Sequence, residues 1–167
     1  GDNTSDDDAD TLNFVYAAKD ATVSGGYGAD SITFSRGLTG GQISGNSGAD
    51  SITVSLALSN AKIYGNTEID SIHVQGSAVT SSIYGGTGND VISVSSKLNA
   101  ARVEGNSGTD SIVVGSTATS SSVYGGKGND TLSIAGASSS YLEGNKGADS
   151  LQIGGSAIAG EINLAPS

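Results

Sequence analysis

Apolar and polar residues alternate in short runs that return about every 20 residues along nearly the whole chain. Residues 31–34 (Ser-Ile-Thr-Phe) show the period-two pattern of a half-buried strand, and 42–44 (Gln-Ile-Ser) predict a second short strand. A Gly-rich turn at 25–30 precedes the first strand, and an irregular turn at 36–40 separates the two strands. A fixed period of this length is typical of a solenoid, in which each repeat forms one coil.

Three columns of apolar residues follow from this repeat, and none of their positions is polar. The first column contains Leu12, Ile32, Ile52, Ile72, Ile92, Ile112, Leu132 and Leu151. The second, two residues further on, contains Phe14, Phe34, Val54, Val74, Val94, Val114, Ile134 and Ile153. The third, from the second strand, contains Val23, Ile43, Ile63, Ile83, Val103, Val123, Leu142 and Ile162. We therefore expect two parallel sheets that enclose a thin layer of aliphatic side chains.

The sequence predicts an all-β fold: a parallel β-solenoid, or β-roll, of about eight two-stranded coils of about 20 residues. Residues 1–167 form a single domain, in which 1–10 is an acidic N-terminal turn and 161–167 is a terminal strand and tail. The second turn often adds one more apolar residue, as at Leu38, Leu58, Leu98 and Ile158. Since adjacent strands are ~4.8 Å apart, eight coils extend over ~38 Å.

One aspartate closes each Gly-rich turn, so stacked coils bring eight carboxylates into a column on one edge. The column contains Asp10, Asp30, Asp50, Asp70, Asp90, Asp110, Asp130 and, after one deletion, Asp149. Two carboxylates ~5 Å apart repel by ~1 kcal/mol even in bulk water, so such a column requires cations. Glycine or asparagine in the turns allows positive φ and exposes backbone carbonyls, and Ca²⁺ binds about six to eight oxygens of this kind. We therefore predict calcium as the cofactor.

Six turns have a Gly-Gly-x-Gly-x-Asp or Gly-Asn-x-Gly-x-Asp pattern, among them 25–30, 45–50 and 125–130. Followed by an apolar residue two positions on, they resemble the calcium-binding nonapeptide of RTX (hemolysin-type) proteins, over essentially the whole chain. The resemblance implies that Ca²⁺ lies between successive turns, held by the eight aspartates and by the backbone around the turn glycines. These glycines are Gly26, Gly28, Gly48, Gly86, Gly88, Gly108, Gly126, Gly128 and Gly147.

Three features depart from the RTX pattern. Only one turn in each coil has the motif, so we expect one row of calcium on one edge. Glu68 replaces a motif glycine, which puts the site at 65–70 in doubt, and the first turn, 5–10, contains no glycine and is expected to bind differently.

The composition narrows the classes of function. A net charge of −10 disfavours nucleic acid as a partner, because phosphates call for a basic surface. The absence of cysteine excludes disulfides and fits an exported protein stabilised by metal. No apolar run is long enough to span a membrane, and no signal peptide is visible. The chain begins at Gly1 and contains no methionine, which indicates a processed chain or a fragment.

The remaining side chains suggest surface contacts. His73 is the one histidine and lies at an outward strand position, where a surface role is expected, and no nucleophile or zinc motif predicts an enzyme. Tyr64, Tyr84 and Tyr124 share an outward column. Packing between coils and a lateral contact with a protein or glycan are both open explanations for these tyrosines.

Two classes of function remain. The first is an extracellular or cell-surface structural protein, disordered without calcium, whose copies associate end to end in a filament, sheath, surface layer or matrix. The second is an adhesin segment, or the secretion-linked module of a larger exported protein with a glycan or cell-surface partner. A related calcium solenoid binds ice, but the irregular third turn position (Tyr27, Ser47, Thr67, Thr87, Ser107, Lys127, Lys146) disfavours that activity.

Overall fold

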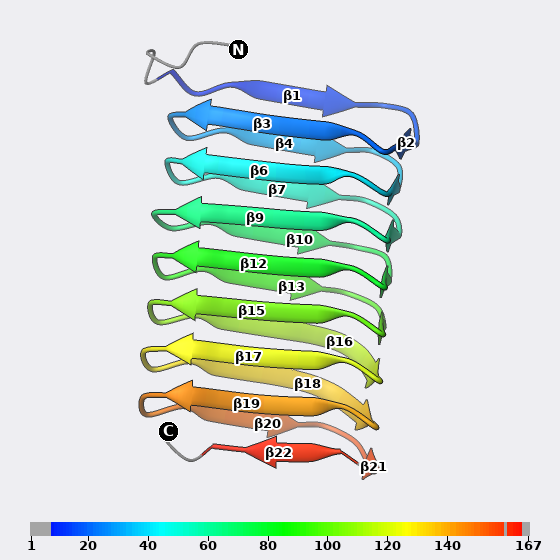
Figure 1. Cartoon of the computed structure of the whole chain (residues 1–167), viewed down its shortest axis with the longest axis vertical. Coiled ribbons are helices and arrows are strands. Elements are labelled where there is room, and N and C mark those ends of the chain that lie inside the picture. The colour runs from blue at the N-terminus through cyan, green and yellow to red at the C-terminus, as the bar shows by residue number, and fades with distance from the viewer. Residues whose placement is uncertain (1–7, 159, 165–167) are drawn as a thin grey trace.

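The computed structural model describes residues 8–158 and 160–164, with only the backbone given for Ile158. The chain winds into eight stacked coils and contains strands but no helix over these residues (Figure 1). Every strand pairs in parallel with the equivalent strands of the neighbouring coils, as in the register of Ile72 with Ile52 and Ile92. The predicted all-β parallel solenoid is therefore confirmed.

The first strand of each coil contains two of the apolar columns. These strands are β1 (Thr11–Phe14), β4 (Ser31–Phe34), β7 (Ser51–Val54), β10 (Ser71–Val74), β13 (Val91–Val94), β16 (Ser111–Thr119), β18 (Thr131–Ser138) and β20 (Ser150–Ile153). The strand that returns to the Gly-rich turn is longer than predicted and includes the first three turn residues. These strands are β3 (Thr22–Tyr27), β6 (Gln42–Ser47), β9 (Lys62–Thr67), β12 (Ser82–Thr87), β15 (Arg102–Ser107), β17 (Ser122–Lys127), β19 (Tyr141–Lys146) and β22 (Glu161–Asn163).

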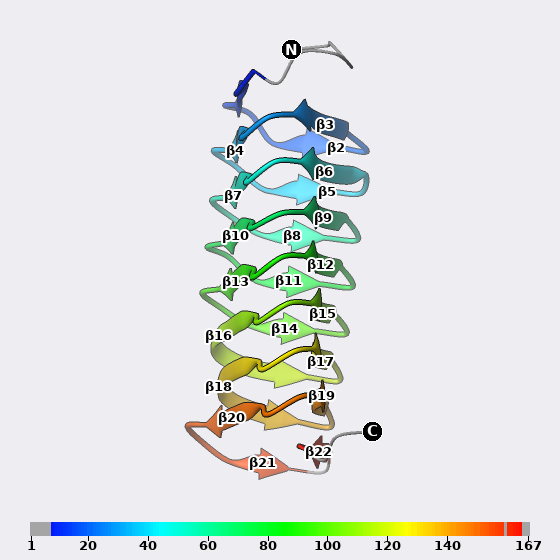
Figure 2. The same ribbon diagram turned by 90° about the vertical axis from the view of Figure 1, so that its left-hand side faces the viewer.

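Each coil also contains a short segment that two-stranded coils do not include, and Figure 2 shows this third series along the solenoid. It comprises β2 (Ala18–Lys19), β5 (Leu38–Thr39), β8 (Leu58–Ser59), β11 (Ala78–Val79), β14 (Leu98–Asn99) and β21 (Ala157–Ile158), while β16 and β18 run through it without a break. Its physical reason is the apolar residue of the second turn: Leu38, Leu58 and Leu98 are fully buried. When these leucines are buried, the backbone beside them lies against the neighbouring coil and pairs with it as a short parallel strand.

The core is one continuous layer. From Ile32 to Leu142 every residue of the three predicted apolar columns is buried. The Phe14 and Phe34 rings stack with their centroids 4.4 Å apart. At the two ends the same columns are only partly covered, because Leu12, Phe14, Leu151 and Ile153 have a coil on one side alone.

The one-residue deletion before Asp149 lies in β18. Val114 pairs with Ile134, whereas Thr117 pairs with Gly136 instead of Ala137. The register therefore shifts by one position between these pairs, and this shift compensates for the missing residue. This keeps Asp149 in the aspartate column.

Candidate metal centre

The Gly-rich turns lie along one edge of the solenoid, at the left in Figure 1, where β3 leads to β4 and β6 to β7. In each turn the second and fourth residues have positive φ, as Asn46 (80°) and Gly48 (123°) do. All nine glycines that the RTX resemblance points to adopt this conformation. The backbone therefore favours glycine and asparagine here, since other residues rarely adopt positive φ.

The aspartates at the end of the turns form an uninterrupted ladder inside this edge. The backbone N–H of Asp70 donates to Oδ1 of Asp90 at 2.9 Å, and Asp90 donates in turn to Asp110 at 2.8 Å. The same bond links every successive pair from Asp10 to Asp149. The carboxylates thus point inward, and Asp30 to Asp130 are at most 2% exposed.

In seven of the column aspartates the second carboxylate oxygen has no partner among the residues that the structure describes. Oδ2 is buried and accepts no hydrogen bond in Asp30, Asp50, Asp70, Asp90, Asp110, Asp130 and Asp149. Leaving one such group unsatisfied costs about 1–3 kcal/mol, and more when it is charged. A row of these oxygens therefore requires either protons or cations.

Each of these oxygens lies directly against the first glycine of its turn, in the place that a side chain would need. A Cβ on Gly85 would overlap Oδ2 of Asp90 and would lie 2.8 Å from the carbonyl oxygen of Gly105, one coil on. At the equivalent glycines from Gly25 to Gly125 this Cβ position is 2.5–2.9 Å from the next coil's carbonyl oxygen. A carboxylate oxygen of one coil and a carbonyl oxygen of the next therefore both lie close to the same glycine.

The glycines at the first position of the turns were absent from the predicted metal residues. They are Gly25, Gly45, Gly65, Gly85, Gly105, Gly125 and Gly144. The available signal was that this position is glycine in every Gly-rich turn although its φ is not positive, so conformational freedom does not explain it. The need for space beside the carboxylate does explain it.

The opposite corner of the coil provides an internal comparison. There Ser81 and Ser121 are also buried, and their hydroxyls accept the N–H of Ala61 and Ala101 in the preceding coil. Each hydroxyl then donates to a carbonyl two residues back, that of Val79 or Thr119, so it is fully satisfied. One side-chain oxygen per coil is therefore enough to form a hydrogen-bonded ladder. The second oxygen of each aspartate takes no part in the ladder.

The electrostatics of the column agree with this reasoning. Burial raises the pKa of Asp50 to about 6 and that of Asp70 and Asp110 to about 7, and it also raises the pKa of Asp90 and Asp130. The N–H bond to Oδ1 acts in the opposite direction, but it is the weaker effect. A proton and a cation therefore compete for the same oxygens near neutral pH.

The donor set suits a hard cation. Carboxylate and carbonyl oxygens are the ligands that Ca²⁺ prefers, whereas zinc and copper sites use nitrogen and sulfur. Over the part of the chain that the structure describes, no group of three or more Asp, Glu, His or Cys side chains converges on one point. A calcium ion here would be held by few carboxylates and several backbone carbonyls, an arrangement associated with weak sites.

The turn with Glu68 keeps the common geometry. Glu68 adopts a φ of 70°, and Asp70 remains buried with a free Oδ2, as in the other turns. The Glu68 carboxylate accepts hydrogen bonds from the Thr67 hydroxyl and the Gly48 N–H, which lower its pKa. Glu68 put calcium binding at this turn in doubt, but the backbone geometry gives no reason for a loss of the site.

The remaining predicted residues lie at the N-terminal end of the ladder or away from it. Asp10 is half-buried, and most of the first turn, at 5–7, falls outside the described residues, as do 1–4 and 165–167. Nε2 of His73, on β10, is 3.5 Å from the Ser95 hydroxyl at the surface. The ring centroids of Tyr64 and Tyr84 are 5.1 Å apart on the sheet that contains β9 and β12.

No family model matches this chain, and searches of curated proteins and of solved structures found no match either. In the described residues, no helix has the length and apolar character needed to cross a lipid bilayer. The function must therefore be argued from the turns and surfaces themselves.

Replacing one column aspartate by asparagine is expected to remove calcium without removing the ladder. In Asp90→Asn the side-chain oxygen still accepts the Asp70 N–H, and an amide NH₂ replaces the unsatisfied oxygen beside Gly105. We expect the variant to bind at least one ion fewer, measured by isothermal titration calorimetry. Its calcium-dependent gain in unfolding free energy should fall by about 1–3 kcal/mol.

The control for this variant is Asp20→Asn. Asp20 is exposed and lies at the other corner of the coil, so the substitution removes the same charge outside the column. Equal calcium stoichiometry in the two variants would show that the column does not bind the ions.

Proposed function

We propose that this chain is a calcium-stabilised structural solenoid that acts outside the cell. The observation that supports it is the row of seven buried, unpartnered Oδ2 atoms, each packed against the first glycine of its turn. A resident Ca²⁺ would neutralise the carboxylates and join successive turns. The column aspartates would hold it, together with backbone carbonyls such as that of Gly105, as in the RTX repeats that the turns resemble.

The weakness of such sites supports an extracellular location. Sites with few carboxylates bind calcium at about 10⁻⁴–10⁻³ M in extracellular modules, whereas intracellular sensors respond at far lower concentrations. Such sites would fill only where calcium is abundant. The chain lacks cysteine, so metal ions would replace the disulfides that stabilise many secreted domains.

The two end faces support a role in assembly. Edge strands β1 and β3 pair on one side only, as do β20 and β22 at the other end. At the C-terminal face Ile162 is 46% exposed and Leu164 is 43% exposed. Since all coils are parallel and in register, a second copy could continue the solenoid by placing its β1 on β20 and its β3 on β22. Contacts of this head-to-tail kind do not close and therefore build filaments.

Electron microscopy of the purified chain tests this assembly. In millimolar calcium we expect fibres with an axial repeat of ~38 Å, and in excess chelator we expect none. Ile162→Asp should abolish the fibres, because it places a charge on the proposed contact. Leu56→Asp is the matched control, since Leu56 is 49% exposed and lies between β7 and β8, away from both the ends and the Gly-rich turns.

The second candidate is a module of a longer exported protein. The same half-covered end faces favour it, because further coils of one chain would cover them in the same way. Folded single particles in calcium, with no fibres at any concentration, would contradict the assembly and support the module. Neither proposal assigns a catalytic role.

A further inference from the structure

A hollow lies on the outer face of the sheet that contains β9, β12 and β15, away from the aspartate column. Its volume is about 460 Å³, within the range of ~300–1,000 Å³ that is usual for small-molecule sites. Gly85 and Gly86 form its floor, because Gly86 stands between Asn66 and Asn106 in the register of the three strands. The missing side chain at Gly86 opens the space between these two asparagines.

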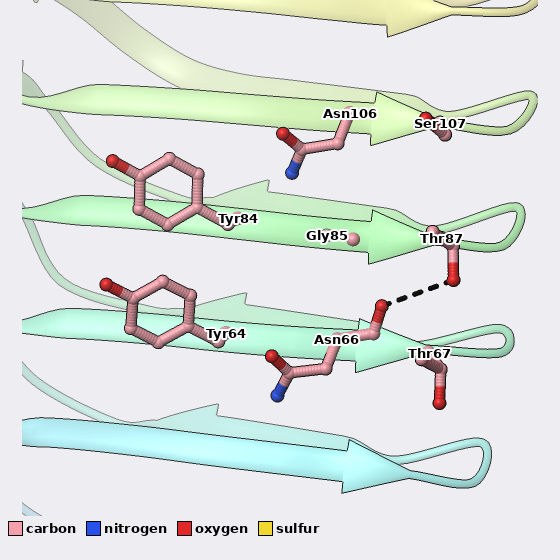
Figure 3. A pocket seen from close by; sticks show the side chains of 9 residues that line it. Tyr64, Asn66, Thr67, Tyr84, Gly85, Thr87, Asn106 and Ser107 are labelled. Carbon is pink, nitrogen blue, oxygen red and sulfur yellow. Dashed lines mark hydrogen bonds between the residues drawn. The ribbon is translucent and has the colours of Figure 1, made fainter.

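Tyr64 and Tyr84 form one wall of the hollow. The planes of the two rings are inclined by 12° to each other. Figure 3 shows both rings face-on, with the Asn66 and Asn106 side chains beside them. Thr87 lies on the other side of the glycine floor, and its hydroxyl is 3.5 Å from the Asn66 carbonyl oxygen. The hollow therefore has an aromatic wall on one side and a hydroxyl on the other.

The Asn106 amide is free to bind a ligand. The amides of Asn46 and Asn66 each donate to a serine of the preceding coil, Ser24 or Ser44, at 2.6 and 2.7 Å. The corresponding residue for Asn106 is Tyr84, which cannot take the place of that serine, and the Asn106 side chain makes no hydrogen bond to any described residue. An amide with two donors and one acceptor is thus available beside an aromatic ring.

No charged side chain lines this hollow. We propose that it binds an uncharged saccharide, with one sugar ring packed on the tyrosines and its hydroxyls bonded to Asn66, Asn106 and Thr87. The C–H groups of a pyranose carry partial positive charge and are attracted to the negative face of an aromatic ring. A nucleic acid would also stack on tyrosine, but the net charge of −10 opposes its phosphates.

The same backbone pattern recurs two coils on, but there the neighbouring aromatic ring is covered. A hollow of about 360 Å³ lies over Gly126. The Arg102 guanidinium lies 4.2 Å from the Tyr124 ring centroid, so that it covers the ring, and also pairs with Glu104 at 2.6 Å. This second hollow therefore lacks an uncovered aromatic surface, and Tyr124 provides a matched control for Tyr84.

A glycan array that displays neutral and acidic glycans, probed with the whole chain in millimolar calcium, tests the proposal. We expect neutral glycans among the ligands, and we expect a soluble hexasaccharide of the bound type to give a measurable affinity by calorimetry. Tyr84→Ala and Asn106→Ala should each weaken that affinity at least tenfold. Tyr124→Ala and Asn46→Ala should change it less than twofold.

Three outcomes would overturn the proposal: no neutral ligand on the array, binding of acidic glycans alone, or equal losses in Tyr84→Ala and Tyr124→Ala. Tyr84→Phe keeps the ring, so it should retain most of the affinity, and circular dichroism checks that each variant is folded. The site does not depend on the assembly proposed above, since Tyr84 and Asn106 lie in the central coils.

Discussion

Removal of calcium by excess EGTA is expected to unfold the whole solenoid. Without the ion, seven buried carboxylate oxygens have neither a hydrogen bond nor a counter-charge. At about 1–3 kcal/mol for each unsatisfied group, and more for a charged one, their combined cost is comparable to the ~5–15 kcal/mol net stability of a typical domain. The aliphatic core is only one layer thick, and it cannot offset a penalty of that size.

Circular dichroism and size-exclusion chromatography measure this effect. We expect the strand signal to disappear and the hydrodynamic radius to increase in EGTA, with both restored by millimolar Ca²⁺. Mg²⁺ at the same concentration is the control for simple charge screening, because it demands a small octahedral site and keeps its waters. A strand signal unchanged by the chelator, or restored equally by Mg²⁺, would contradict a specific calcium role.

Acid is expected to fold the calcium-free chain. Desolvation by burial raises the pKa of Asp50 to about 6 and of Asp70 and Asp110 to about 7, from the ordinary value of 3.8. At pH values between the ordinary pKa of 3.8 and the raised pKa of about 6 to 7, the folded state therefore binds more protons than the unfolded state. The stabilisation is fully present below about pH 4 and is lost as the pH rises through about 6 to 7. A protonated Oδ2 also becomes a donor and can bond to the nearby glycine carbonyl.

Urea denaturation of the chain freed of calcium by dialysis, at several pH values, tests this dependence. The midpoint is expected to be highest near pH 4 and to decrease as the pH rises, until no folded baseline remains near neutral pH. In saturating calcium the trend should reverse, because protons then displace the ion that stabilises the fold. A calcium-free midpoint that increases with pH would show that the buried carboxylates are not the cause of the instability.

The coil and its core could be predicted from residues far apart in the sequence. Ile32, Ile52 and Ile72 recur at a constant spacing, and a constant spacing with period-two alternation is compatible with little other than stacked parallel strands. The turn conformation could also be predicted, because glycine or asparagine stands at the positions that need positive φ, as at Asn46 and Gly48. The short strand at Leu38–Thr39 was missed, since two residues are too few to show a period.

The sequence by itself determined that this protein is a solenoid with one aspartate per coil on one edge, because repetition is a property of the chain. Only the tertiary structure decided that each carboxylate points inward, satisfies one oxygen with the preceding coil's N–H and leaves the other buried against a turn glycine without a hydrogen bond. It also decided that the Asn106 amide is free, whereas that of Asn66 is bonded. Both outcomes depend on partners one coil away, which become neighbours only when the coils stack.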